Sequence, residues 1–124
     1  MRIICLCVAL FVATVSTATL AADSHGHAPL HGGVVSVVKE IDFELIAKPD
    51  LLQLHVRDHG KPLDVSKATA KLSLLSGTDK QDVELKPVGG VLEAKGSFKV
   101  GAKTKAVALV SIGGQTSTVR FVLK

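Results

Sequence analysis

The chain has 124 residues, of which 47% are hydrophobic, and a formal charge of +4 at pH 7, a composition that suits one domain with one core. Aromatic residues make up only 3% of the chain, too few for the stacking surfaces that single-stranded nucleic acids and carbohydrates require. The positive excess is modest and the lysines are scattered, which also argues against a nucleic-acid partner.

The first 22 residues follow the order of a secretory signal peptide. Arg2 precedes an apolar run at 3–15, and residues 16–22 are small and weakly polar. A retained anchor is the alternative, because the uncharged stretch is about long enough to span a bilayer. Its second half is Thr, Ser and Ala, however. We expect cleavage after Ala21 or Ala22 and export to the periplasm, with the mature protein not embedded in the membrane.

The expected mature chain contains no sulfur. Met1, Cys5 and Cys7 are the chain's only methionine and cysteines, and all three lie in the signal peptide. The cysteines also come too early to be a lipid-modified first residue. The mature protein is therefore expected to have no disulfide, no thiolate metal site and no cysteine nucleophile.

From Gly32 onward the sequence alternates short apolar runs with turn signals. The runs are rich in Val, Leu and Ile and lie at 33–38, 41–48, 51–57, 70–75, 81–86, 91–95, 105–112 and 117–124. Several alternate with period two: Phe43 and Leu45 share one face, whereas Asp42 and Glu44 share the other, as in half-buried strands.

Turn signals and strand count together predict the fold. Segments rich in Gly, Pro and Asp separate the runs about every ten residues, at 48–50, 58–62, 76–80, 88–90, 101–105 and 113–115. No window predicts a long amphipathic helix, although 65–70 allows one turn. We predict a mobile tail at 23–31 and an all-β domain at 32–124. Its expected form is an antiparallel β-sandwich of seven to eight short strands with immunoglobulin-like architecture.

Three of the five histidines, His25, His27 and His31, fall within seven positions among small residues. Neutral imidazole is a good ligand for Cu(II), Zn(II), Ni(II) and Co(II). In an extended segment the first two point the same way, with Cα atoms roughly 6.5 Å apart, and Pro29 can bend the chain so that the third joins them. The cluster predicts a metal site. The alternative is a polar tail whose histidines bind nothing.

The cleavage site decides whether a second copper ligand set exists. If cleavage follows Ala22, the mature chain begins Asp23-Ser24-His25. The free amine, two amide nitrogens and the imidazole then offer Cu(II) or Ni(II) four nitrogen donors in a square plane. If cleavage follows Ala21, the histidine is fourth and this chelate is lost. The sequence leaves both starts open.

His55 and His59 form a second, wider pair. Alternation places His55 on the outward face of its strand beside Arg57, and His59 lies in the 58–62 turn beside Asp58. A straight strand separates the two histidines by about 13 Å, so they share one ion only if the turn folds back. Each is either an ordinary surface histidine or an added ligand of the N-terminal cluster.

Several stretches resemble one family. They are HGGVV at 31–35, FELIAKPD at 43–50, LHVRDHGKPLD at 54–64, AKLSLLSG at 70–77 and LEAKGSFKVGAKTKAVALVSI at 92–112. Together they are similar to small periplasmic proteins that resemble the His-rich N-terminal module of periplasmic adaptor subunits in heavy-metal efflux pumps of the resistance-nodulation-division class.

This resemblance implies a periplasmic β-domain that buffers or exports copper, zinc, cobalt or cadmium ions. It also implies ligands at His25, His27 and His31, and then at His55 and His59. The chain has no room for the helical hairpin, lipoyl halves and barrel of the adaptors, so it does not bridge a pump by itself.

The sequence therefore predicts a periplasmic protein that binds a divalent transition-metal ion, with Cu(II) favoured by the affinity order and Zn(II), Ni(II) or Co(II) as alternatives. It would act as a buffer or carrier, with an efflux-pump adaptor as partner. The competing prediction is a non-catalytic interaction module that docks on a membrane or efflux partner through a sheet edge. We expect no enzyme activity, because no GxSxG, HExxH or phosphate-cradling loop occurs.

Overall fold

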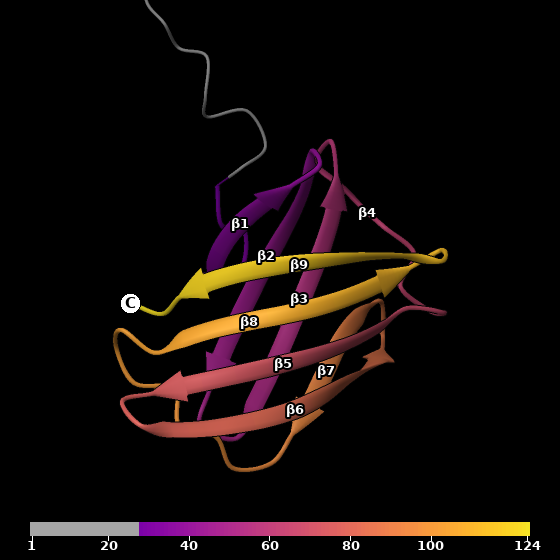
Figure 1. Cartoon of the computed structure of the whole chain (residues 1–124). Helices are drawn as coiled ribbons and strands as arrows, with labels where there is room; N and C mark the ends of the chain where they lie inside the picture. The colour runs from indigo at the N-terminus through magenta and orange to yellow at the C-terminus, as the bar shows by residue number, and fades with distance from the viewer. Residues whose placement is uncertain (1–27) are drawn as a thin grey trace, which may run out of the picture.

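The structure is a computed structural model that describes residues 28–124, and it consists of nine β-strands (Figure 1). The strands are β1 (Val34–Val38), β2 (Ile41–Lys48), β3 (Leu51–Asp58), β4 (Lys61–Pro62), β5 (Thr69–Ser76), β6 (Asp79–Val88), β7 (Val91–Lys95), β8 (Lys105–Ile112) and β9 (Gln115–Val122). Over this range, the protein has no helix of the length and hydropathy that a membrane span requires.

The all-β, antiparallel prediction is confirmed. All strand pairs are antiparallel, and each of the eight predicted runs overlaps one strand of five or more residues. The structure has one strand more than the seven to eight predicted. The additional strand is β4, which has two residues and pairs with the end of β3. Two residues are too few to show an alternating pattern in the sequence.

The strands form one continuous path instead of two separate sheets. Their order is β1-β2-β3-β7-β6-β5-β8-β9, and Figure 1 shows β9, β8, β5 and β6 crossing in front of β1, β2, β3 and β7. β6 joins the two layers, because its first part pairs with β5 and residues 86–88 pair with β7. The end strands β1 and β9 approach each other. The result is an antiparallel sheet nearly closed into a barrel, and the immunoglobulin-like arrangement is not established.

Tight turns lie at five of the six predicted positions and also at 39–40, whereas longer loops at 63–68 and 96–104 connect β4 to β5 and β7 to β8. At Gly113 and Gly114 both φ angles are positive, as a two-residue turn of the hairpin type requires. Lys39 and Glu40 adopt the same positive φ without glycine. Non-glycine residues pay a steric cost there, so the pairing of β1 with β2 imposes this turn against local preference.

One face of the curved sheet forms the core. The buried side chains come from alternate positions of nearly every strand, and the largest that are fully buried include Leu45, Leu52, Leu54, Leu72, Leu74, Leu85 and Leu92. Pro49 and Leu123 backbone groups hydrogen-bond to the loop at 96–104, which closes one end of this core with Phe98. A single core is consistent with the single domain expected from length.

Leu72→Ala tests this core, because Leu72 is fully buried and truncation leaves a cavity. We expect the free energy of unfolding to fall by about 2–5 kcal/mol, measured by urea denaturation. The control is Leu109→Ala on the outer face, where the native side chain is 47% exposed and the expected change is about 0.5 kcal/mol or less. Equal losses would contradict the assignment of inner and outer faces.

Candidate functional site

The β2–β3 hairpin places four polar side chains together on the face of the sheet away from the core. Its two-residue turn sets the register so that Glu44 lies opposite His55 and Asp42 opposite Arg57. The alternation of β2 and β3 predicted this outward direction. These residues are not solvated, however: Glu44, Asp42 and Arg57 are 0%, 2% and 3% exposed. A layer of charge is therefore buried on the outer side of the hairpin.

The segment at 28–33 contacts this layer through its backbone. The N–H groups of Leu30, His31 and Gly33 donate to the Glu44 carboxylate at 3.1, 2.8 and 3.0 Å. A carboxylate that accepts several backbone N–H groups is held strongly, because these bonds are charge-assisted. Glu44 therefore anchors residues 30–33 against β2, including two residues that the sequence assigned to the tail.

Arg57 completes the anchor from β3. Its Nη1 donates to Glu44 Oε1 at 2.9 Å, and its Nη2 donates to the carbonyl of Ala28 at 3.2 Å. The guanidinium thus bridges the buried carboxylate and the start of the described chain. Removing one partner of such a buried pair leaves the other charge without compensation, which costs about 3–5 kcal/mol.

His31 and His55 stack on each other beside this pair. Their ring centroids are 3.9 Å apart and the rings are inclined by 15°. His31 Nδ1 lies 3.1 Å from Glu44 Oε1. Since the ionised carboxylate only accepts hydrogen bonds, Nδ1 carries the proton in the neutral ring, and Nε2 keeps its lone pair. A histidine oriented by a carboxylate in this way is the usual arrangement of a metal-ligating imidazole.

The His55 ring also has a free nitrogen. Its Nε2 is buried and has no hydrogen-bond partner. Burial lowers the pKa of His55, and the nearby His31 and Arg57 lower it further against the opposing effect of Glu44. The imidazole is therefore neutral at pH 7, the form that binds metals. A buried imidazole nitrogen without a partner fits a site that takes a further ligand or ion.

The two stacked rings do not by themselves form a closed metal site. Nearly parallel imidazoles direct their ring nitrogens within two separate planes, away from a common point. Consistent with this, no group of three or more His, Cys, Asp or Glu residues between positions 28 and 124 is placed to hold a metal ion. Any ion here would need donors from elsewhere in the chain.

The other predicted site residues are placed differently. His25 and His27 lie outside the described residues. His59 lies in the turn between β3 and β4, where its Nδ1 contacts Asp58 and its Nε2 is 3.9 Å from Glu40 Oε2. Its side chain is 75% exposed. The described contacts join His31 to His55 but do not bring His59 to them.

Sequence reasoning missed Glu44 and Arg57 as members of this site. The signal was present in the hairpin: a two-residue turn at 49–50 dictates that Glu44 faces His55 across the strands. The sequence did not predict that residues 28–33 cover this face, because their contact with it depends on the path of the chain before β1.

The chain matches no family model, no curated protein and no solved structure. The resemblance to the N-terminal modules of efflux adaptors stays a prediction.

Glu44 makes the free energy of unfolding depend on pH in the acidic range. Burial raises its pKa, but the N–H groups of Gly33, His31 and Leu30 together with the His31 ring lower it more, from 4.5 to about 2. As the pH falls below 4.5, this carboxylate is protonated in the unfolded chain, whereas in the folded chain it stays ionised until the pH approaches 2. The free energy of unfolding should therefore decrease by about 3 kcal/mol between pH 4.5 and pH 2.

Urea denaturation at a series of pH values measures this decrease. Glu44→Gln, which has no carboxylate at this position, should be less stable than the native chain at pH 7 and should lose this part of the pH dependence. Parallel pH profiles of the two proteins would contradict the role of Glu44.

Gly33 lets the segment approach β2 closely enough for the anchor to form. A Cβ at this position would lie 2.5 Å from the carbonyl oxygen of Leu45 and 3.0 Å from Cγ of Glu44. Gly33→Ala should therefore lower the free energy of unfolding by about 1–3 kcal/mol. Gly101→Ala is the control, because a Cβ there meets open space. Equal thermal stability of the two variants would show that the segment does not need this approach.

Proposed function

We propose that this protein binds a divalent transition-metal ion in the periplasm through the imidazoles of His25, His27 and His31, with His55 beside them. Cu(II) is the preferred ion by the affinity order of nitrogen sites, and Zn(II), Ni(II) or Co(II) are alternatives. The protein acts as a buffer or carrier of the ion, associated with heavy-metal efflux through a pump adaptor. No catalytic step is part of this function.

The observation that carries the proposal is the contact between His31 Nδ1 and the buried Glu44 carboxylate, at 3.1 Å. It fixes the tautomer that leaves Nε2 of His31 available, and the ring is 44% exposed, so an ion can reach it. The neutral His55 ring and its unpartnered nitrogen lie directly against it.

The chain connection supplies the missing donors. His27 is bonded to Ala28, whose carbonyl is held by Arg57, and His25 is three residues before Ala28. Because consecutive Cα atoms are about 3.8 Å apart, both histidines have the reach to join His31. One ion would then combine imidazoles of the N-terminal segment with the anchored histidine of the domain.

An ion held in this way exchanges easily. Its donors are neutral imidazoles, no thiolate takes part, and His31 faces solvent. Such a site suits a carrier better than a structural metal, and the fold, with a complete core of its own, should not need the ion. Binding should weaken as the pH falls, because protons compete with the ion for the imidazole nitrogens.

Calorimetric titration with Cu(II) and Zn(II), against a competing chelator, tests the proposal on the exported protein after intact mass has fixed its first residue. We expect one tight equivalent of Cu(II) that is lost in the triple variant His25→Ala, His27→Ala and His31→Ala. Glu44→Gln should bind about 10–100-fold more weakly, since it removes the acceptor that orients His31.

His59→Ala is the matched control, because it removes an imidazole that lies apart from the site, and its affinity should equal that of the native chain. Weak binding that the triple variant leaves unchanged would contradict the proposal. So would unfolding of the native protein by chelator alone.

A further inference from the structure

A row of alternating lysine and apolar side chains crosses the outer face of the front sheet. The strand registers place Lys80 of β6 opposite Leu75 of β5, Leu75 opposite Lys105 of β8, and Lys105 opposite Val122 of β9. Their neighbours in the chain, such as Leu74 and Phe121, point into the core. All four therefore point outward, with cross-strand Cβ atoms about 4.5–5.5 Å apart.

The apolar members of this row are uncovered. Leu75 is 41% exposed and Val122 is 56% exposed, and the two lysines beside them are exposed as well. Exposed aliphatic side chains flanked by lysines can bind favourably to a lipid surface. The aliphatic groups enter the boundary of the acyl chains, and the long lysine side chains reach the headgroups.

More lysines gather around the same corner of the molecule. The loop at 96–104 carries Lys99 and Lys103, and it is fixed to the β2–β3 turn by the bond from Phe98 N–H to the Pro49 carbonyl at 2.8 Å. The bond from Lys103 N–H to the carbonyl of Leu123, also 2.8 Å, fixes it to the end of β9. We call this region the basic corner and define it by Lys48, Lys80, Lys99, Lys103, Lys105 and Lys124.

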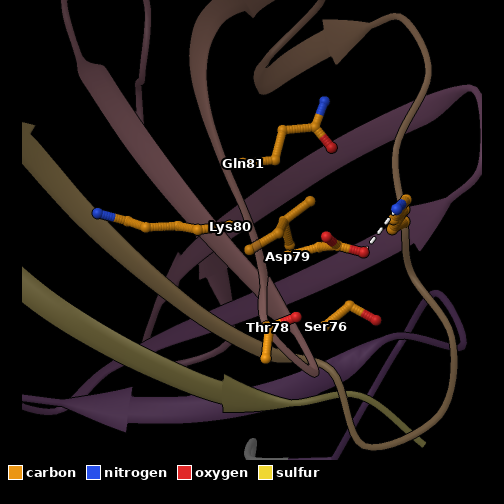
Figure 2. Close-up of a pocket in the computed structure, with 7 residues that line it drawn as sticks. Ser76, Thr78, Asp79, Lys80 and Gln81 are labelled. Atoms are coloured by element: carbon orange, nitrogen blue, oxygen red, sulfur yellow. Dashed lines mark hydrogen bonds and ion pairs between the residues drawn. The ribbon is translucent and has the colours of Figure 1, made fainter.

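Figure 2 shows how one side of the basic corner is built. A pocket of about 350 Å³ lies between the β5–β6 turn and the loop at 96–104, and Asp79 spans it to meet Lys99 Nζ at 2.6 Å. Lys80 also lines the pocket, and its side chain extends in the direction opposite to the pair of Asp79 and Lys99. Asp79 compensates the charge of Lys99 beside the pocket, and the Lys80 ammonium group lies on the outer face, 3.9 Å from Asp82 Oδ2.

The charges are distributed unevenly between the two ends of the fold. The basic corner holds six lysines against the side chains of Asp50, Asp79 and Asp82, the last of which lies 3.9 Å from Lys80 Nζ. At the opposite end, the turns at 39–40 and 58–61 and the loop at 62–68 hold equal numbers of basic and acidic residues, namely Lys39, Lys61 and Lys67 against Glu40, Asp58 and Asp64. The basic corner therefore carries an excess of positive charge that the opposite end lacks.

We propose that the basic corner docks on an anionic phospholipid surface, with Leu75 and Val122 entering the interface between Lys80 and Lys105. A membrane fits better than an acidic protein, because the row alternates lysines with exposed aliphatic groups, and a lipid surface offers both anionic headgroups and an apolar boundary. Each lysine near such a surface contributes about fivefold to binding (about 1 kcal/mol), and salt weakens the contribution. The docking does not depend on the proposed metal site.

Vesicle flotation tests this docking with the exported chain. Vesicles of phosphatidylglycerol and phosphatidylcholine are compared with vesicles of phosphatidylcholine alone, at low and high salt. The native chain should float with the anionic vesicles only, and less at high salt. The double variant Lys80→Glu and Lys105→Glu should lose binding by at least about tenfold. The matched control is Lys61→Glu with Lys67→Glu, which makes the same charge change at the opposite end and should bind as the native chain does.

A second double variant, Leu75→Ser with Val122→Ser, tests the apolar part and should bind several-fold more weakly. Equal flotation with both vesicle types would overturn the proposal, and so would equal losses in the basic-corner variant and its control. Native binding by the serine variant would overturn insertion of the apolar pair. Copper titration of the basic-corner variant should match that of the native chain, so a failure here is distinct from a failure of the metal site.

Discussion

The Glu44 carboxylate is the group on which the N-terminal part of this structure depends. It is fully buried on the face of the sheet that faces away from the core, where a charge without partners would be very costly. Arg57 and three backbone N–H groups satisfy it. The same bonds hold the chain before β1 in one path, so the carboxylate has its full set of partners when the segment at 28–33 is in place.

The anchor also explains why two histidines meet. His31 is carried to Glu44 by the backbone bonds on either side of it, and His55 already lies opposite Glu44 through the register of the hairpin. The stacked pair is therefore a consequence of two independent constraints, one local and one tertiary. A buried ion pair is in itself weak support for stability, but here it determines where an imidazole with a free nitrogen is presented.

The two proposed surfaces adjoin each other. A cavity of about 260 Å³ has His31 and Gly33 as well as Lys48 and Lys124 in its lining. If the basic corner rests on a lipid surface, the histidines are held near that surface too. A carrier that exchanges its ion with a membrane-bound pump would use this arrangement, since docking shortens the distance over which the ion must be transferred.

The sequence by itself determined the strands, because period-two alternation and Gly- or Pro-containing turns are local properties that the folded chain keeps. It also determined that Glu44, His55 and Arg57 point away from the core. It did not determine that this face is buried, nor that eight of the nine strands form one path joined by β6. Those outcomes depend on contacts between residues far apart in the chain: Ala28 with Arg57, Gly33 with Glu44, and β1 with β9. Only tertiary packing decides such contacts, because no local pattern records which distant segment will cover a polar face.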